Sequence, residues 1–197
     1  MKLLGLTGGV GMGKSTAAAF FQQRGARIVD TDELARELVQ PGQPALDEIR
    51  TVFGDRIVSP DGQLRRDELA SVVFADTVAR KKLERILHPR IRERWLAQVQ
   101  SWRNENYPVA VVVIPLLYET RAESHFDNVI CVACSESSRR ERLLARGWNM
   151  AQIEARIAAQ MSVGEKIARA DFVVWSEGAV ENHSRQVECI LNRLFPV

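Results

Sequence analysis

The segment that most restricts the possible folds is a glycine-rich loop near the start of the 197-residue chain. Residues 8–15 match the pattern G-x-x-x-x-G-K-[ST], after an apolar run over Leu3–Thr7 and before a helical pattern over Ser15–Gln23. A strand, this loop and a helix in that order indicate a phosphate-binding site. An ordinary strand-to-helix turn would not require the pair Lys14 and Ser15. We therefore predict that the loop binds a nucleoside triphosphate.

The residue types of this loop suit polyphosphate binding. Glycines let the backbone wrap closely around phosphates with its N–H groups facing inward, and the helix that follows adds the positive end of its dipole. Lys14 would reach the β- and γ-phosphates, and the Ser15 hydroxyl would bind the Mg²⁺ between them. The predicted nucleotide contacts are Gly8, Gly9, Val10, Gly11, Met12, Gly13, Lys14, Ser15 and Thr16.

Composition limits the class of protein. Hydrophobic residues make up 46% and charged residues 26%, which is typical of a soluble globular protein. A formal charge of +2 gives no indication of nucleic-acid or membrane binding. The longest apolar run, residues 109–118, is about half of the roughly 20 residues that a membrane-spanning helix needs. We expect a cytoplasmic protein without nucleic-acid or membrane partners.

Short apolar runs predict the strands of a parallel sheet. The continuous β-branched run over Val109–Ile114 is typical of a central strand that is buried on both faces. Three further strands are predicted at Ala26–Asp30, Asn128–Cys134 and Phe172–Trp175. The expected fold is an α/β protein of the P-loop NTPase type, with a parallel sheet and helices on both faces.

The long interval between the second and third predicted strands indicates an insertion. Residues 31–108 separate them, whereas a crossover between parallel strands needs only a dozen or more. Apolar residues recur there at a spacing of three to four, which predicts helices. We expect these helices at Glu33–Gln40, Pro44–Phe53, Arg66–Phe74, Thr77–Leu87 with Asp76 as its cap, and Arg90–Trp102, with His88-Pro89 breaking or restarting the chain between the last two.

Two acidic residues are candidates for chemistry. Asp32 follows the second strand, at the sheet edge where open α/β sheets hold ligands, and is a candidate base or substrate-orienting group. Its equally good alternative is to cap the helix that follows. No carboxylate precedes Pro115 at the end of the third strand, so a metal would depend on Ser15, phosphates, water, and Asp32 or Glu119.

An arginine-rich stretch predicts a lid. The helical stretch Ser135–Gly147 carries Arg139, Arg140, Arg142 and Arg146 with Glu141 alone among them. Kinases shield a transferring phosphoryl group from water with arginine-bearing lids, and the alternative is a solvated basic face. The remaining helices are predicted at Met150–Met161 and Val180–Leu194.

Cys131 and Cys134 have the C-x-x-C spacing of redox and zinc sites. They lie in a strand-like run, however, where residues three apart face opposite sides of the sheet. We therefore interpret both as small buried hydrophobic residues.

Short segments in order along nearly the whole chain resemble the dephospho-CoA kinase family, which catalyses the last step of coenzyme A synthesis. The loop alone is common to many nucleotide-binding proteins, whereas Asp-x-Asp, His-Pro and Pro-Leu-Leu-Tyr-Glu together are far more specific. The segments are Gly5–Ser15, Asp30-Thr31-Asp32 with Ala35-Arg36, Asp61-Gly62 with Leu64 and Arg66, Leu83-Glu84, His88-Pro89, Pro115-Leu116-Leu117-Tyr118-Glu119, Arg142, Arg146, Gln160 and Ala170-Asp171.

The resemblance implies three parts. These are a P-loop core in residues 1–32 and 107–197, an inserted helical domain for the CoA substrate in residues 33–106, and a lid over about 136–165 of the core. The implied reaction moves the γ-phosphoryl group of ATP to the ribose 3′-hydroxyl of dephospho-CoA, with Mg²⁺, in a monomer or weak homo-oligomer.

The resemblance also implies roles for single residues. Asp32 would be the base, as carboxylates are in other kinases, Lys14 the phosphate clamp and Arg142 a catalytic lid cation. Arg146 would be a second lid cation that contacts the nucleotide. Ser176 stands where the family usually has Asn, near the expected adenine pocket. The implied substrate contacts are Asp32, Arg66, His88, Pro115 and Leu116.

Other functions are weighed against this one. Another small P-loop kinase, for a nucleoside or nucleotide, remains the main alternative, although the long insert and the Pro-Leu-Leu-Tyr-Glu stretch favour dephospho-CoA. A GTP-binding switch would need Asn-Lys-x-Asp, and an ABC-type ATPase would need Leu-Ser-Gly-Gly-Gln. Neither motif occurs in the sequence.

Overall fold

The computed structural model describes residues 1–196, which separate into two compact units. One unit combines residues 1–29 with the described residues from Ser101 onward, and the other is Asp30–Gln100. A five-stranded sheet runs in the order β2-β3-β1-β4-β5. Its central strand β1 pairs in parallel with β3 and β4, and β4 pairs in parallel with β5. The strands are β1 Lys2–Thr7, β2 Arg27–Asp30, β3 Val109–Val113, β4 Asn128–Ala133 and β5 Phe172–Trp175.

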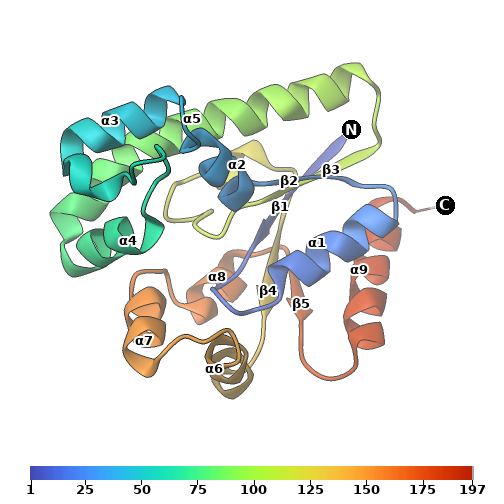
Figure 1. Ribbon diagram of the computed structural model, residues 1–197. Coiled ribbons are helices and arrows are strands. Elements are labelled where there is room, and N and C mark those ends of the chain that lie inside the picture. The colour runs from blue at the N-terminus through green and yellow to red at the C-terminus, as the bar shows by residue number, and fades with distance from the viewer. Residues whose placement is uncertain (197) are drawn as a thin grey trace. The chain divides into compact units, whose positions relative to one another are not determined.

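Helices cover the sheet because both of its faces are apolar. Leu4, Val111 and Ile130 alternate with Val112 and Cys131 along the strands, and all five are buried. Leu4, Val111 and Ile130 pack in a core with helices α1 (Lys14–Gln23) and α9 (Val180–Leu194). These two helices lie side by side in Figure 1. Helix α8 (Val163–Arg169) contacts β4. The prediction of a parallel α/β sheet with helices on both faces is confirmed.

The order of the strands gives the sheet a switch point at β1. The chain leaves β1 towards β2 at one edge, whereas β4 and β5 continue the sheet on the other side of β1. In open α/β sheets, ligands bind at the carboxyl ends of strands where the direction of winding reverses. The glycine-rich loop begins directly after Thr7, the last residue of β1, and therefore lies at this point.

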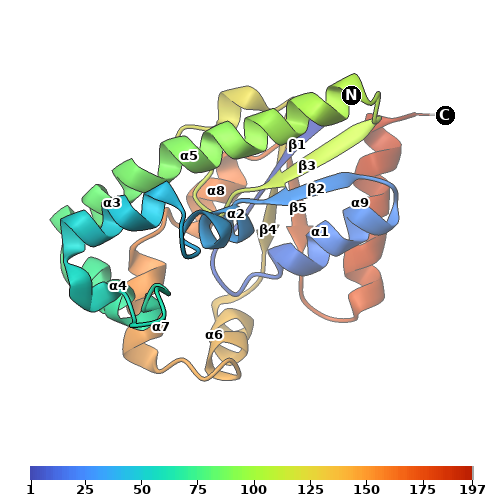
Figure 2. The same ribbon diagram turned by 45° about the horizontal axis from the view of Figure 1, so that its top comes forward.

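The second unit has a helical core of its own. Figure 2 shows its helices, which are α2 Thr31–Leu38, α3 Pro44–Phe53, α4 Arg66–Ala75 and the greater part of α5 Thr77–Asn104. Buried residues such as Ile49, Ile57 and Ile86 form a single cluster there. Helix α3 begins with Pro44, as expected from the fixed φ of proline at a first helical position. Asp76 accepts a hydrogen bond from Val78 N–H at 2.7 Å, as predicted for a cap.

The start of α2 corrects the capping alternative for Asp32. The N-cap is Asp30, whose side chain accepts a hydrogen bond from the Asp32 N–H at 2.8 Å. Asp32 is the second helical residue, and its own side chain is not the cap. A residue at the N-cap must have extended backbone angles, and Asp30, the last residue of β2, already has them.

The predicted break at His88-Pro89 is wrong. Helix α5 runs through Pro89 as one helix of 28 residues. Proline removes one backbone N–H and loosens the carbonyls of the preceding turn. In the turn that precedes the proline, the Arg90 guanidinium donates from Nη1 to the Ile86 carbonyl at 2.7 Å. Ile86 is also buried in the helical core, so tertiary packing supports the helix at this position.

The stretch after the arginine-rich helix also differs from the expectation. Helix α6 spans Glu136–Leu144, and α7 spans Met150–Ala158 rather than reaching Met161. The chain turns after α7 and starts α8, which the periodicity did not predict. A reciprocal capping box between Ser162 and Glu165 begins α8 and explains why α7 does not continue. Among residues 1–196, no helix has the length and apolar character to cross a membrane.

Candidate active site

The backbone of the glycine-rich loop has the conformation that its glycines allow. Gly8 has φ +144°, and a Cβ there would lie 2.3 Å from the Val132 carbonyl oxygen. Gly13 is the left-handed N-cap of α1 with φ +86°. A side chain at either position would strain the loop or push it away from β4. These glycines keep the loop close to the sheet edge at the start of α1.

Lys14 lies over the carbonyl groups of its own loop. Its Nζ donates to Gly8 O and to Gly9 O, both at 3.0 Å. Ser15 and Thr16 are exposed at the N-terminus of α1, whose first turn has no acidic residue. Exposed hydroxyls, the helix N-terminus and an ammonium group within one loop form a site for a polyphosphate.

Of the arginines of the predicted lid, Arg139 contacts the loop directly and Arg142 is linked to it through Ser176. Arg139 is buried, and its Nε donates to Val10 O at 2.9 Å. Arg142 donates from Nη1 to Ser176 Oγ at 2.9 Å, and that hydroxyl donates to Met12 O at 2.8 Å. The sequence interpretation counted Arg139 only as part of a basic run, because nothing in the local pattern shows that it is buried. The inner side of α6 is therefore a support for the loop.

The other two arginines of this region, Arg140 and Arg146, are more exposed to solvent than Arg139. Arg140 forms ion pairs with Glu136 at 3.2 Å and with Glu154 at 3.1 Å. Arg146 is exposed beyond the end of α6. Ser176, in the predicted adenine region, holds Arg142 against the loop, which is a contact that the sequence did not suggest.

An acidic side chain fixes the start of α6. Glu177 accepts hydrogen bonds from the Ser135 hydroxyl, from Ser138 Oγ at 2.5 Å and from Trp175 Nε1 at 2.7 Å. Hydrogen bonds from Ser135 and then from Ser138 lower the pKa of the Glu177 carboxyl to about 2. The network ties the N-terminus of the arginine-bearing helix to the end of β5.

This low pKa predicts a dependence of stability on pH. The folded carboxylate holds a proton less tightly than the unfolded one, so its stabilising effect is full above about pH 4.5 and is lost as the pH falls towards about 2. We expect Glu177→Gln to lower the melting temperature near neutral pH, with a deficit that shrinks in acid. Thermal unfolding of both proteins across this pH range checks it. A deficit that stays constant with pH would contradict the assignment.

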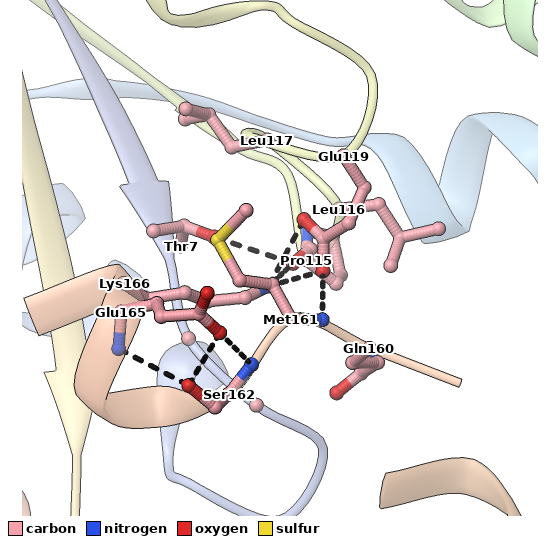
Figure 3. A network of polar contacts seen from close by, with 12 residues as sticks. Thr7, Pro115, Leu116, Leu117, Glu119, Gln160, Met161, Ser162, Glu165 and Lys166 are labelled. Atoms are coloured by element: carbon pink, nitrogen blue, oxygen red, sulfur yellow. Dashed lines mark hydrogen bonds and ion pairs between the residues drawn. The ribbon is translucent and has the colours of Figure 1, made fainter. Parts of the chain in front are cut away.

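Pro115 and Leu116, two predicted substrate contacts, begin the segment after β3. Pro115 O accepts from Lys166 Nζ at 2.6 Å and from Thr7 Oγ1 at 3.3 Å. Lys166 also pairs with Glu119 at 2.9 Å, as drawn in Figure 3. Glu119, which the sequence offered as a metal ligand, is thus engaged by a lysine. No group of three or more metal-ligating side chains occurs within residues 1–196.

Three predicted residues belong to the helical unit. Asp32 is exposed in the first turn of α2, and Arg66 is exposed at the first position of α4. His88 is half-buried on α5, in a surface pocket. Burial lowers the pKa of the His88 imidazole, which is therefore neutral near pH 7. The pocket is lined by Lys81, Glu84, Arg85, His88 and Pro89.

The two cysteines of the C-x-x-C spacing are buried, as predicted. Cys131 lies within β4 and Cys134 directly after it. Burial raises the pKa of the Cys131 thiol to about 11 and also raises that of Cys134. Both are neutral thiols near pH 7, which is consistent with their role as small hydrophobic residues.

The strand order, the loop at the carboxyl end of the central strand and the arginine-bearing helix beside it define a P-loop kinase. A family model described as dephospho-CoA kinase matches residues 2–182. The chain belongs to the dephospho-CoA kinase family, which the sequence resemblance had predicted. It is accordingly an enzyme that uses ATP to phosphorylate dephospho-CoA.

Named relatives agree with this membership, and a solved structure is similar in fold. A dephospho-CoA kinase of Anaeromyxobacter dehalogenans is 47% identical over 92% of this chain and 86% of its own length. One of Geobacter sulfurreducens is 40% identical over the whole of both chains. A crystal structure from Thermus thermophilus has a TM-score of 0.83 and 31% identity, and covers 98% of this chain and 97% of its own.

Proposed function

We propose that this chain transfers the γ-phosphoryl group of ATP to the ribose 3′-hydroxyl of dephospho-CoA, with the glycine-rich loop as its nucleotide site. The observation that carries the proposal is the loop itself, with Lys14 over its carbonyl groups and exposed hydroxyls at the start of α1. Its glycine-rich backbone suits the phosphates, and Lys14, held over the carbonyl groups of Gly8 and Gly9, would reach the transferring group from there. Arg142 and Arg146 are proposed to stabilise the charge that develops on that group.

The residues present suit an Mg²⁺ ion that is held mainly by the phosphates of the nucleotide. Mg²⁺ usually keeps several waters and takes only one or two protein ligands beside the phosphates of the nucleotide. The exposed Ser15 hydroxyl suits that role, and the described residues offer no cage of carboxylates. When bound, the ion would neutralise charge on the β- and γ-phosphates.

The helical unit is the proposed domain for the acceptor. Asp32 would accept the proton of the ribose hydroxyl as the new bond forms. Arg66 and the pocket around His88 offer groups for an anionic substrate, because Lys81 and Arg85 line that pocket and outnumber Glu84. The cytoplasmic location and the monomeric or weakly associated state remain predictions.

Arg142 provides a test of the proposed lid chemistry. We expect Arg142→Ala to lower kcat by more than about tenfold, because a cation that meets developing charge acts mainly in the transition state. Steady-state kinetics with Mg-ATP and dephospho-CoA measure the effect. An unchanged kcat would reduce Arg142 to a structural contact of Ser176.

The reaction itself is tested by product analysis. Purified protein is supplied with Mg-ATP, with and without dephospho-CoA, and both ADP and the position of the new phosphate are measured. We expect release of ADP that depends on dephospho-CoA, with a 3′-phosphate on the product. Folded protein that binds ATP without this dependence would reject the substrate, and a screen of nucleosides and nucleotides would then test the alternative kinase function.

A further inference from the structure

Val10, within the glycine-rich loop, has a side-chain hydrogen bond to each of its two polar backbone groups. Gln160 Oε1 accepts a hydrogen bond from Val10 N–H at 3.1 Å, and Arg139 Nε donates to Val10 O at 2.9 Å. Gln160 lies between α7 and α8, and Arg139 lies on α6, so both side chains come from the segment after β4. The loop therefore does not hold its shape by its own contacts alone.

The contact from Gln160 fixes the orientation of one peptide plane. In the peptide that joins Gly9 to Val10, the carbonyl oxygen accepts from Lys14 Nζ at 3.0 Å, and the N–H donates to Gln160. A trans peptide is planar, and its C=O and N–H point in opposite directions. By holding the N–H outside the loop, Gln160 keeps the Gly9 carbonyl facing Lys14.

Gln160 is in turn placed by a chain of polar contacts. The next residue, Met161, donates its N–H to Glu119 Oε1 at 2.8 Å. Glu119 is paired with Lys166, whose side chain is fully buried. Lys166 also donates to Pro115 O at 2.6 Å. Figure 3 shows Lys166 and Glu119 between the Pro115 segment and the turn that carries Gln160.

A buried lysine calls for a physical explanation. Moving an ammonium group out of water is costly, and an apolar residue of similar size often stabilises a fold as well or better. Lys166 makes contacts that an apolar residue could not make, because it joins Pro115 O and Glu119 from the interior. Pro115 O also accepts from Thr7, the residue that directly precedes the loop. The network thus includes Thr7, directly before the loop, and contacts Val10 within the loop through Gln160.

We propose that Gln160 and Lys166 are positioning residues for phosphoryl transfer. Lys166 and Glu119 fix the turn before α8, which places Gln160. Gln160 then holds the Gly9–Val10 peptide in one orientation and thereby keeps Lys14 in place. This inference rests on the proposed role of Lys14. Without the Gln160 contact, the peptide rotates and Lys14 loses one of its two carbonyl contacts. A mobile Lys14 still attracts ATP but meets the developing charge less well, so the loss falls on kcat.

The test is a double-mutant cycle with kinetic readouts. We expect Gln160→Ala to lower kcat by about tenfold or more while KM for ATP changes by less than about threefold. Lys166→Met, which keeps the length but removes the charge, should act in the same way. Because both act through one chain of contacts, the double variant should be no worse than the more damaging single variant. Gln23→Ala, an exposed glutamine at the end of α1, is the matched control and should match the wild type.

Each other outcome counts against the inference. Equal kcat in Gln160→Ala and wild type, a loss confined to KM, or losses in the two variants that multiply would each overturn it. Circular dichroism shows whether the variants fold, and Glu119→Ala replaces Lys166→Met in the cycle if the latter does not. Wild-type protein that fails to phosphorylate dephospho-CoA would instead contradict the proposed function, so the two failures are distinguishable.

Discussion

Replacement of Asp32 by Asn should abolish most turnover while leaving nucleotide binding intact. A general base contributes about 10²- to 10⁴-fold to rate, and asparagine has the size of aspartate but no carboxylate to accept the proton. We therefore expect kcat of Asp32→Asn to fall within that range. The fold should survive, because α2 is capped by Asp30 and Asp32 is exposed.

Asp30 provides the matched control for this experiment. Asparagine caps helices about as well as aspartate, so Asp30→Asn keeps the hydrogen bond to the Asp32 N–H and should turn over near the wild-type rate. Steady-state kinetics give kcat for both variants, and titration with ATP gives the affinity. Weaker ATP binding by Asp32→Asn would assign Asp32 to the metal site, and an unchanged kcat would remove it from catalysis.

The local sequence pattern was enough to predict the strand and the helix on either side of the loop. The strand, glycine loop and helix from Lys2 to Gln23 were predicted within about one residue, because apolar runs and positive-φ glycines are signals within a few neighbouring residues. The strand bounds at Val109–Val113 and Phe172–Trp175 followed in the same way. Family membership was predictable because its motifs are also short and local.

Prediction failed where contacts distant in sequence decide the outcome. Pro89 is tolerated inside α5 because Ile86, in the preceding turn, is buried in the helical core against residues such as Ile49. The missed helix α8 is a different case, because Ser162 and Glu165 form a local capping-box pattern that is visible in the sequence. The turn before α8, rather than apolar spacing, sets where α7 ends.

The residues that support the site were harder to find. Arg139 and Lys166 are charged, and charged residues are rarely buried, so their residue type predicts a position on the surface. Both are nevertheless buried, because each has hydrogen-bond partners more than 40 positions away in the chain. Gln160 was noted as part of the family resemblance, but its contact with Val10 spans 150 residues and has no local signal.

Replacement of Lys14 by Met should remove the cation on which the proposed chemistry depends. Loss of one preorganised electrostatic contact costs about 10²- to 10³-fold in kcat. We expect at least this loss in Lys14→Met, because the variant also lacks the contacts to Gly8 O and Gly9 O that shape the loop. CoA formation under saturating Mg-ATP measures it. Lys2→Met, at the start of β1 and thus at the end of that strand opposite to the loop, is the control and should keep wild-type activity.

The distribution of the Lys14→Met effect between kcat and KM tests the site more sharply than its size. A point charge that follows the γ-phosphoryl group through transfer acts chiefly on kcat, whereas one that only attracts the nucleotide acts equally on ground and transition states and raises KM. We therefore expect kcat to fall by a larger factor than KM rises. A variant that loses only affinity would show that Lys14 anchors ATP without assisting transfer. In that case Gln160 and Lys166, which hold Lys14 through Gly9, could not affect kcat by this route.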